Sequence, residues 1–195
     1  MKDKNNYSMS FTTGSLLEKE SITYAHTYIR LKDWNKVAQE IKDNNLFQYR
    51  TLVATKRILQ ELKSRFAYLN EDAINLIVSG FSSDSQQILW FAICKKHPFI
   101  FEFMKEIVRE KYYMGQFELT NYDFDAFYNR KMLQHISLEK ISDSSRYKLK
   151  QVLFKMLREV GIINNQNFIQ AVLPSAHVAK IINSQDPEYL CIFTS

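Results

Sequence analysis

Residues 141–172, ISDSSRYKLKQVLFKMLREVGIINNQNFIQAV, decide which fold this chain adopts. Apolar side chains recur there at the i, i+3, i+4, i+7, i+8 and i+11 spacing of one helix face: Leu149, Val152, Leu153, Met156, Leu157 and Val160. Basic side chains fall outside that face: Arg146, Lys148, Lys150, Lys155 and Arg158. The pattern predicts a long amphipathic helix that buries one face and leaves a cationic face outside.

The residues around this helix predict where it begins and ends. Candidate N-caps precede it: Ser142, Asp143, Ser144 and Ser145. Gly161 stands where a left-handed residue commonly ends a helix. The apolar pairs 162–163 and 168–169 then flank a polar tetrad, which predicts a short hairpin. The apolar run 189–193 is predicted to be a terminal strand that joins this hairpin in a small C-terminal sheet.

A helix followed by a hairpin is the order of a recognition helix and a wing, so we expect a winged-helix-like unit. A helix fits the major groove of DNA, its first amides and hydroxyls can meet phosphates, and a hairpin can reach the adjoining backbone. The nucleic-acid-binding residues predicted in this unit are Ser144, Ser145, Arg146, Lys148, Lys150, Lys155, Arg158, Asn164 and Asn165. Two other interpretations stay open, a core helix with a solvated basic face and a unit that docks proteins.

A second basic helix is predicted over residues 48–69. One side carries Leu52, Leu59, Leu62, Phe66 and Leu69, and the other faces carry Arg50, Lys56, Arg57, Lys63 and Arg65 against a single acid, Glu61. A shorter helix and a polar turn precede it, which is the order of a helix-turn-helix. Arg50, Lys56, Arg57 and Lys63 are therefore secondary candidates for DNA contact, although long basic helices are often simply solvated.

Composition favours a mainly α fold with few hairpins. The 195 residues include only 4 Gly and 3 Pro, and 46% are hydrophobic, which is ample for a packed core. Lys and Arg exceed Asp and Glu by 26 to 21, a net charge of +5 that favours polyanionic partners where it is concentrated on one surface. The small polar stretch after Gly80 predicts a boundary between an N-terminal helical domain, 1–80, and a C-terminal helical domain, 81–195. Helices are also expected over 84–96 and over 98–113, the latter with Pro98 at its first position.

The motifs of enzymes and cofactor-binding proteins are missing from the sequence. The glycines fit no phosphate-binding loop, and the histidines have no metal-type spacing. Asp123 and Asp125 precede a predicted helix and are expected to be caps, and Cys94 and Cys191 are expected to be free thiols. We therefore expect no enzyme activity, cofactor, metal or small-molecule substrate. The apolar runs are too short and too interrupted to span a membrane and no secretory signal is evident, so a cytoplasmic location is expected.

Several segments in order along the chain resemble the BrxA family, the small non-catalytic component of BREX phage-defence systems in bacteria. They are 7–17 (YSMSFTTGSLL), 45–46, 56–57, 61–65, 89–94 (LWFAIC), 145–149 and 157–161. The resemblance implies a helical protein with winged-helix-like parts that binds duplex DNA and works beside other BREX proteins, without catalysis of its own. The family is also described as an inner-membrane protein, which the apolar runs contradict, and as similar to NusB-type RNA-binding factors. A docking scaffold for other defence proteins and NusB-like RNA binding are therefore the alternatives.

Overall fold

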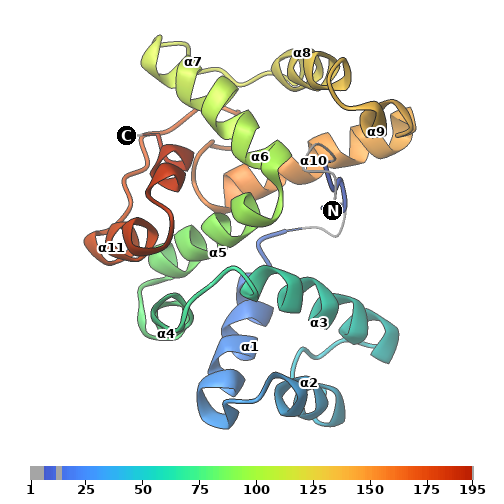
Figure 1. Cartoon of the computed structure of the whole chain (residues 1–195), viewed down its shortest axis with the longest axis vertical. Helices are drawn as coiled ribbons and strands as arrows, with labels where there is room; N and C mark the ends of the chain where they lie inside the picture. The colour runs from blue at the N-terminus through green and yellow to red at the C-terminus, as the bar shows by residue number, and fades with distance from the viewer. Residues whose placement is uncertain (1–6, 12–14, 195) are drawn as a thin grey trace.

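A computed structural model describes residues 7–11 and 15–194 and shows a mainly helical protein (Figure 1). The helices in chain order are α1 (Glu18–Leu31), α2 (Trp34–Asp43), α3 (Leu52–Phe66), α4 (Glu71–Ser79), α5 (Ser82–Lys96), α6 (Pro98–Phe103), α7 (Arg109–Tyr113), α8 (Asn121–Met132), α9 (Ile136–Glu139), α10 (Asp143–Glu159) and α11 (Ala176–Gln185). A π-helical segment, η1 (Met104–Val108), and a 3-10 helix, η2 (Pro187–Ile192), complete the secondary structure. Within the described residues, no helix is long and apolar enough to cross a lipid bilayer.

The first three helices pack around a tryptophan. Asp33 caps α2 by accepting hydrogen bonds from the backbone amides of Asn35 and Lys36, and the hydroxyl of Thr51 caps α3 by accepting one from the amide of Ala54. The ring of Trp34 stacks on Tyr28 with centroids 3.7 Å apart and on Tyr24 at 4.8 Å, and it meets Phe66 edge-on. These aromatic contacts fix α1, α2 and α3 in one unit.

Helix α5 is the central element of the molecule (Figure 1). Every side chain from residue 88 to residue 94 is buried, so this helix is surrounded on all sides. It packs against α1, α3, α4, α6 and α11, on both sides of the expected boundary between residues 80 and 81. The division into domains 1–80 and 81–195 stays a prediction.

The helix expected over 98–113 is confirmed, with a π-helical middle. Pro98 opens α6, and α6, η1 and α7 follow one another without a break. The ring of Phe99 lies 5.1 Å from that of Phe127 and Phe103 lies 5.3 Å from the same ring, so this helix holds α8 by aromatic contacts.

The amphipathic helix expected from residues 141–172 is confirmed as α10. Ser142 is its N-cap, and its hydroxyl accepts a hydrogen bond from the amide of Ser145 at 3.3 Å. Gly161 has the left-handed conformation expected after a helix end, with φ of 78°. The predicted apolar face, including Leu149, Leu153 and Leu157, is buried.

The expected C-terminal hairpin and sheet are wrong. Among residues 7–11 and 15–194 there is no strand, only isolated antiparallel bridges that pair Ile163 with Ile169 and Glu118 with Phe168. The side chain of Asn164 accepts a hydrogen bond from the backbone amide of Phe168 at 2.9 Å, and the amide of Ile169 donates one to the carbonyl of Phe117 at 2.7 Å. Because these donors are used locally or by a third segment, no two-stranded ladder extends. The run 189–193 is also not a strand, because η2 covers most of it.

His97, between α5 and α6, predicts how stability depends on pH. Burial, assisted by the charge of Lys96, lowers the pKa of this imidazole to about 4. Between about pH 6.5 and pH 4 the unfolded chain therefore binds a proton that the folded chain does not. The contribution of His97 to the free energy of unfolding is complete above that range and is lost as pH falls through it. We expect the free energy of unfolding to fall by roughly 2–3 kcal/mol from about pH 7 to about pH 4.5.

Urea unfolding at the two pH values measures this loss, and the variant His97→Asn isolates it. The histidine Nδ1 lies 3.2 Å from the carbonyl of Ser8, a contact that the shorter amide can replace without titrating. The free energy of unfolding should fall less between the two pH values in the variant than in the wild type, and the difference is the contribution of His97. An equal fall in both proteins would contradict the assignment.

Candidate nucleic-acid interface

Two of the predicted cations of α10 face α8 and are ion-paired there. Arg146 Nη2 lies 3.2 Å from Asp125 Oδ1, and Lys150 Nζ lies 2.8 Å from Asp125 Oδ2. The guanidinium of Arg146 also covers the ring of Tyr128 at 4.4 Å. The side chains of Arg146 and Lys150 are only 21% and 13% exposed, so they anchor α10 to α8. Since two cations share one carboxylate, the cluster keeps a net positive charge.

Other predicted residues of α10 face outward. Ser144, Lys148, Gln151 and Lys155 recur at i, i+4, i+7 and i+11 and are all exposed; together they form the exposed α10 stripe. Lys155 makes a long ion pair of 3.6 Å with Glu159, and within the part of the chain that the structure describes Lys148 has neither an ion pair nor a side-chain hydrogen bond. The hydroxyl of Ser145 accepts a hydrogen bond from Ser142 at 3.0 Å, also at the exposed start of the helix. The stripe carries two cations and no acid.

The loop after α10 is held against the end of the helix. Arg158 Nη2 donates to Asn167 Oδ1 at 2.7 Å, and Asn167 itself has a left-handed backbone with φ of 64°. Asn164 is half-buried, and its side-chain Oδ1 accepts hydrogen bonds from two backbone amides of the loop, whereas Asn165 is exposed. Of the two predicted wing residues, Asn164 therefore shapes the loop and Asn165 faces outward.

The predicted candidates of the second basic helix lie on the surface, three of them on α3 and Arg50 in the segment before it. Arg50, Lys56, Arg57 and Lys63 are all exposed. Leu52, which the periodicity assigned to the apolar side, is 59% exposed as well. The connection between α2 and α3 runs over residues 44–51, longer than the turn of about 3–4 residues in a helix-turn-helix.

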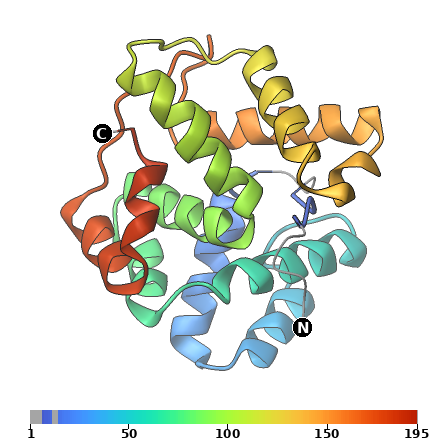
Figure 2. The same cartoon turned by 45° about the horizontal axis from the view of Figure 1, so that its top comes forward.

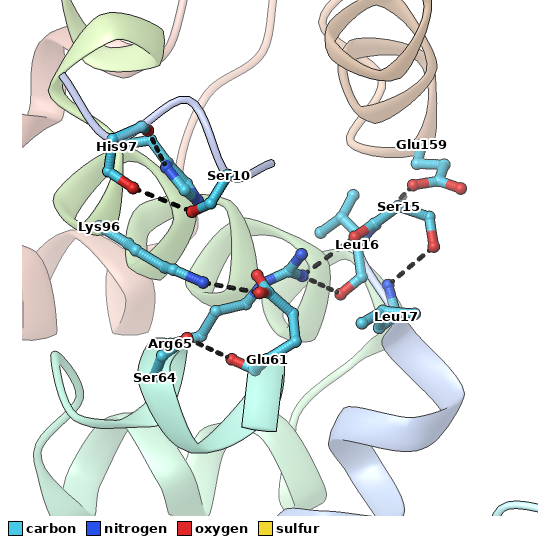
Figure 3. A network of polar contacts seen from close by, with 11 residues as sticks. Ser10, Ser15, Leu16, Leu17, Glu61, Ser64, Arg65, Lys96, His97 and Glu159 are labelled. Atoms are coloured by element: carbon cyan, nitrogen blue, oxygen red, sulfur yellow. Dashed lines mark hydrogen bonds and ion pairs between the residues drawn. The ribbon is translucent and has the colours of Figure 1, made fainter. Parts of the chain in front are cut away.

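Arg65 lies in the interior instead, although its position in the sequence groups it with the basic faces of α3. Its side chain is 2% exposed, and its Nη1 donates to the carbonyls of Ser15 and Leu16 at 3.0 Å each (Figure 3). Its Nε donates to Glu61 Oε1 at 2.8 Å, and Glu61 also pairs with Lys96 of α5 at 2.7 Å. Partial burial acts to raise the pKa of Glu61, but the two cations outweigh it and hold the pKa below its ordinary value. The carboxylate therefore stays ionised.

The same cluster connects α3 to α10. Glu159 at the end of α10 accepts a hydrogen bond from the backbone amide of Leu16 at 2.7 Å, while Arg65 of α3 holds the carbonyl of that residue (Figure 3). We call Glu61, Arg65, Lys96, Glu159 and the backbone of 15–16 the polar clamp. Both helices run from the same side of the molecule towards this clamp (Figures 1 and 2). The clamp thus joins the end of α10 to α3 through the backbone of residues 15–16.

The structure also places the carboxylates and cysteines that the sequence singled out. Among the described residues, no group of three or more His, Cys, Asp and Glu side chains could hold a metal ion. Neither aspartate precedes the helix as expected: Asp123 lies in the first turn of α8, where its carboxylate completes a capping box with the N-cap Thr120, and Asp125 is the ion-pair partner of α10. Cys94 and Cys191 are free thiols, and burial raises the pKa of both.

The fold and the charged surfaces define a small, mainly helical protein with two clamped basic helices. The BrxA family matches residues 5–186, and the chain belongs to this family. BREX protein BrxA of Bacillus cereus (strain H3081.97) is 33% identical over 131 residues, which are 67% of this chain and 66% of that protein. The chain therefore spans just under two thirds of that relative.

Two further proteins are similar over longer stretches. BREX protein BrxA of Escherichia coli O9:H4 (strain HS) is 26% identical over 151 residues, 77% of this chain and 71% of that protein. The crystal structure of an uncharacterized protein from Magnetospirillum magneticum superposes with a TM-score of 0.83 at 20% identity, covering 97% of this chain and 100% of the other. At that identity the match shows a shared fold.

Proposed function

We propose that this protein is a non-enzymatic, DNA-binding component of a bacterial BREX phage-defence system. The family and the names of the two BrxA relatives support the system. In this proposal the protein contacts duplex DNA mainly through phosphates, works in the cytoplasm where that DNA is found, and meets other BREX proteins there.

The exposed α10 stripe carries the proposal. Its cations are presented by a helix whose opposite face is buried in the core, so the charges are held in fixed positions. Arg146 and Lys150 share one carboxylate, so the pair keeps a positive charge that adds to the potential beside the stripe. Helix α3 offers a second set of exposed cations. Lys and Arg at such positions neutralise phosphates without reading the sequence of bases.

A titration of the purified protein on fluorescent duplex DNA at several salt concentrations tests this function. We expect binding at low salt, little difference between duplex sequences, and a log–log slope of roughly −3 for about three to four phosphate contacts. Single-stranded DNA and RNA of the same sequence are the comparison, and tighter binding to RNA would favour a NusB-like role. Failure to retain any nucleic acid at low salt would reject the proposal.

A docking role is the second candidate. Leu133 and Ile136, at the junction of α8 and α9, are 85% and 72% exposed, and exposed apolar side chains can form protein-docking surfaces. A scaffold would retain other BREX proteins through such contacts at salt concentrations that abolish binding to phosphates. Co-purification with those proteins at high salt, together with the DNA titration, separates the two roles.

A further inference from the structure

A groove beside the exposed α10 stripe has a composition that phosphate contacts alone do not need. It has a volume of about 340 Å³ and lies between α10, the start of α8 and the loop that follows α10. It is lined by Asn121, Tyr147, Lys150, Gln151, Phe154, Arg158 and Asn167. We call it the α10 groove.

The lining combines three chemistries. Lys150 and Arg158 are cations, and the lining includes no carboxylate. Asn121, Gln151 and Asn167 supply amides that can donate and accept hydrogen bonds at the edge of a base. The ring of Tyr147 is 59% exposed and offers a face for stacking. An anionic group joined to a planar, hydrogen-bonding base meets all three, and a nucleotide is such a ligand.

The groove is formed without a ligand. Asp125 holds Lys150, Asn167 holds Arg158, and the ring of Phe154 is buried beneath. Less conformational freedom is therefore lost when a ligand enters.

The shape of the site determines the state of the nucleotide. A base inside a duplex is stacked and paired, so it cannot enter a concave site beside a helix unless it leaves the stack. We propose that the α10 groove takes one unpaired nucleotide of a DNA strand, while the adjoining duplex lies on the exposed α10 stripe. This inference rests on the proposed duplex binding and adds a preference for DNA with an unpaired base.

Three fluorescent DNA duplexes of the same sequence test the proposal: one fully paired, one with a single extra adenosine, and one with an abasic residue in place of that adenosine. The adenosine bulge should bind at least about fivefold more tightly than the abasic bulge, because only the base can stack. Tyr147→Ala should remove this preference and leave the affinity for the paired duplex unchanged, and Tyr147→Phe should keep it. Phe81→Ala, which removes an 83% exposed ring outside the groove, is the control.

The outcomes separate this inference from the proposed function. Equal affinity of the wild type for the adenosine and abasic bulges, with the paired duplex bound, overturns the groove as a base site and leaves duplex binding intact. A preference that survives in Tyr147→Ala also overturns it. Failure of the wild type to bind any of the three duplexes overturns both proposals.

Discussion

Replacing Arg65 by alanine is expected to lower the free energy of unfolding by about 3 kcal/mol or more, because it removes one partner of a buried ion pair. The carbonyls of Ser15 and Leu16 lose their donor, and Glu61 keeps only Lys96. A buried acceptor left without a partner has a large desolvation cost. Urea or thermal unfolding measures the change.

Lys63→Ala is the matched control for this prediction. Lys63 lies on the same helix and has the same charge, but it is exposed, so its removal should cost within about 0.5 kcal/mol. If Arg65→Ala cost no more than Lys63→Ala, the polar clamp would not hold α3 to the segment at 15–16. Glu159→Gln should lower the free energy of unfolding by less than Arg65→Ala does, because the side-chain oxygen of glutamine still accepts the hydrogen bond from the amide of Leu16.

The sequence predicts those parts of the fold that depend on local interactions. The periodicity, the serine N-cap and Gly161 of α10 act within a few residues, and all are present as expected. The terminal run 189–193 is too short for periodicity to separate strand from helix, and Pro187 begins a 3-10 helix there. The expected hairpin fails for a similar reason, since the amide of Ile169 bonds to Phe117, a residue far away in the sequence.

The candidate site shows the same limit. The pattern separates the basic residues of α10 from its buried face, but it does not tell which cations are paired, because Asp125 lies 21 residues before Arg146. Arg65 and Glu61 are spaced four apart, which indicates a pair on one helix face. The burial of that pair depends on the carbonyl of Leu16, 49 residues away, which no local pattern contains.

These pairings change which variant tests DNA binding most cleanly. Neutralising Arg146 and Lys150 would also leave Asp125 without a partner, so a loss of binding could come from a displaced α10. Lys148 and Lys155 are exposed and support little of the fold, so changing them should alter the free energy of unfolding by within about 0.5 kcal/mol.

The double variant Lys148→Ala with Lys155→Ala is therefore expected to bind duplex DNA about 50- to 100-fold more weakly at roughly 0.1 M salt, with a salt slope shallower by about two units. Each lost phosphate contact removes about 0.9 from the slope, and at that salt concentration this is nearly tenfold in affinity. The matched control, Lys36→Ala with Lys180→Ala, removes the same charge from exposed lysines outside α10. Equal affinities and slopes in the two double variants would mean that net charge, and not the exposed α10 stripe, determines how this protein meets DNA.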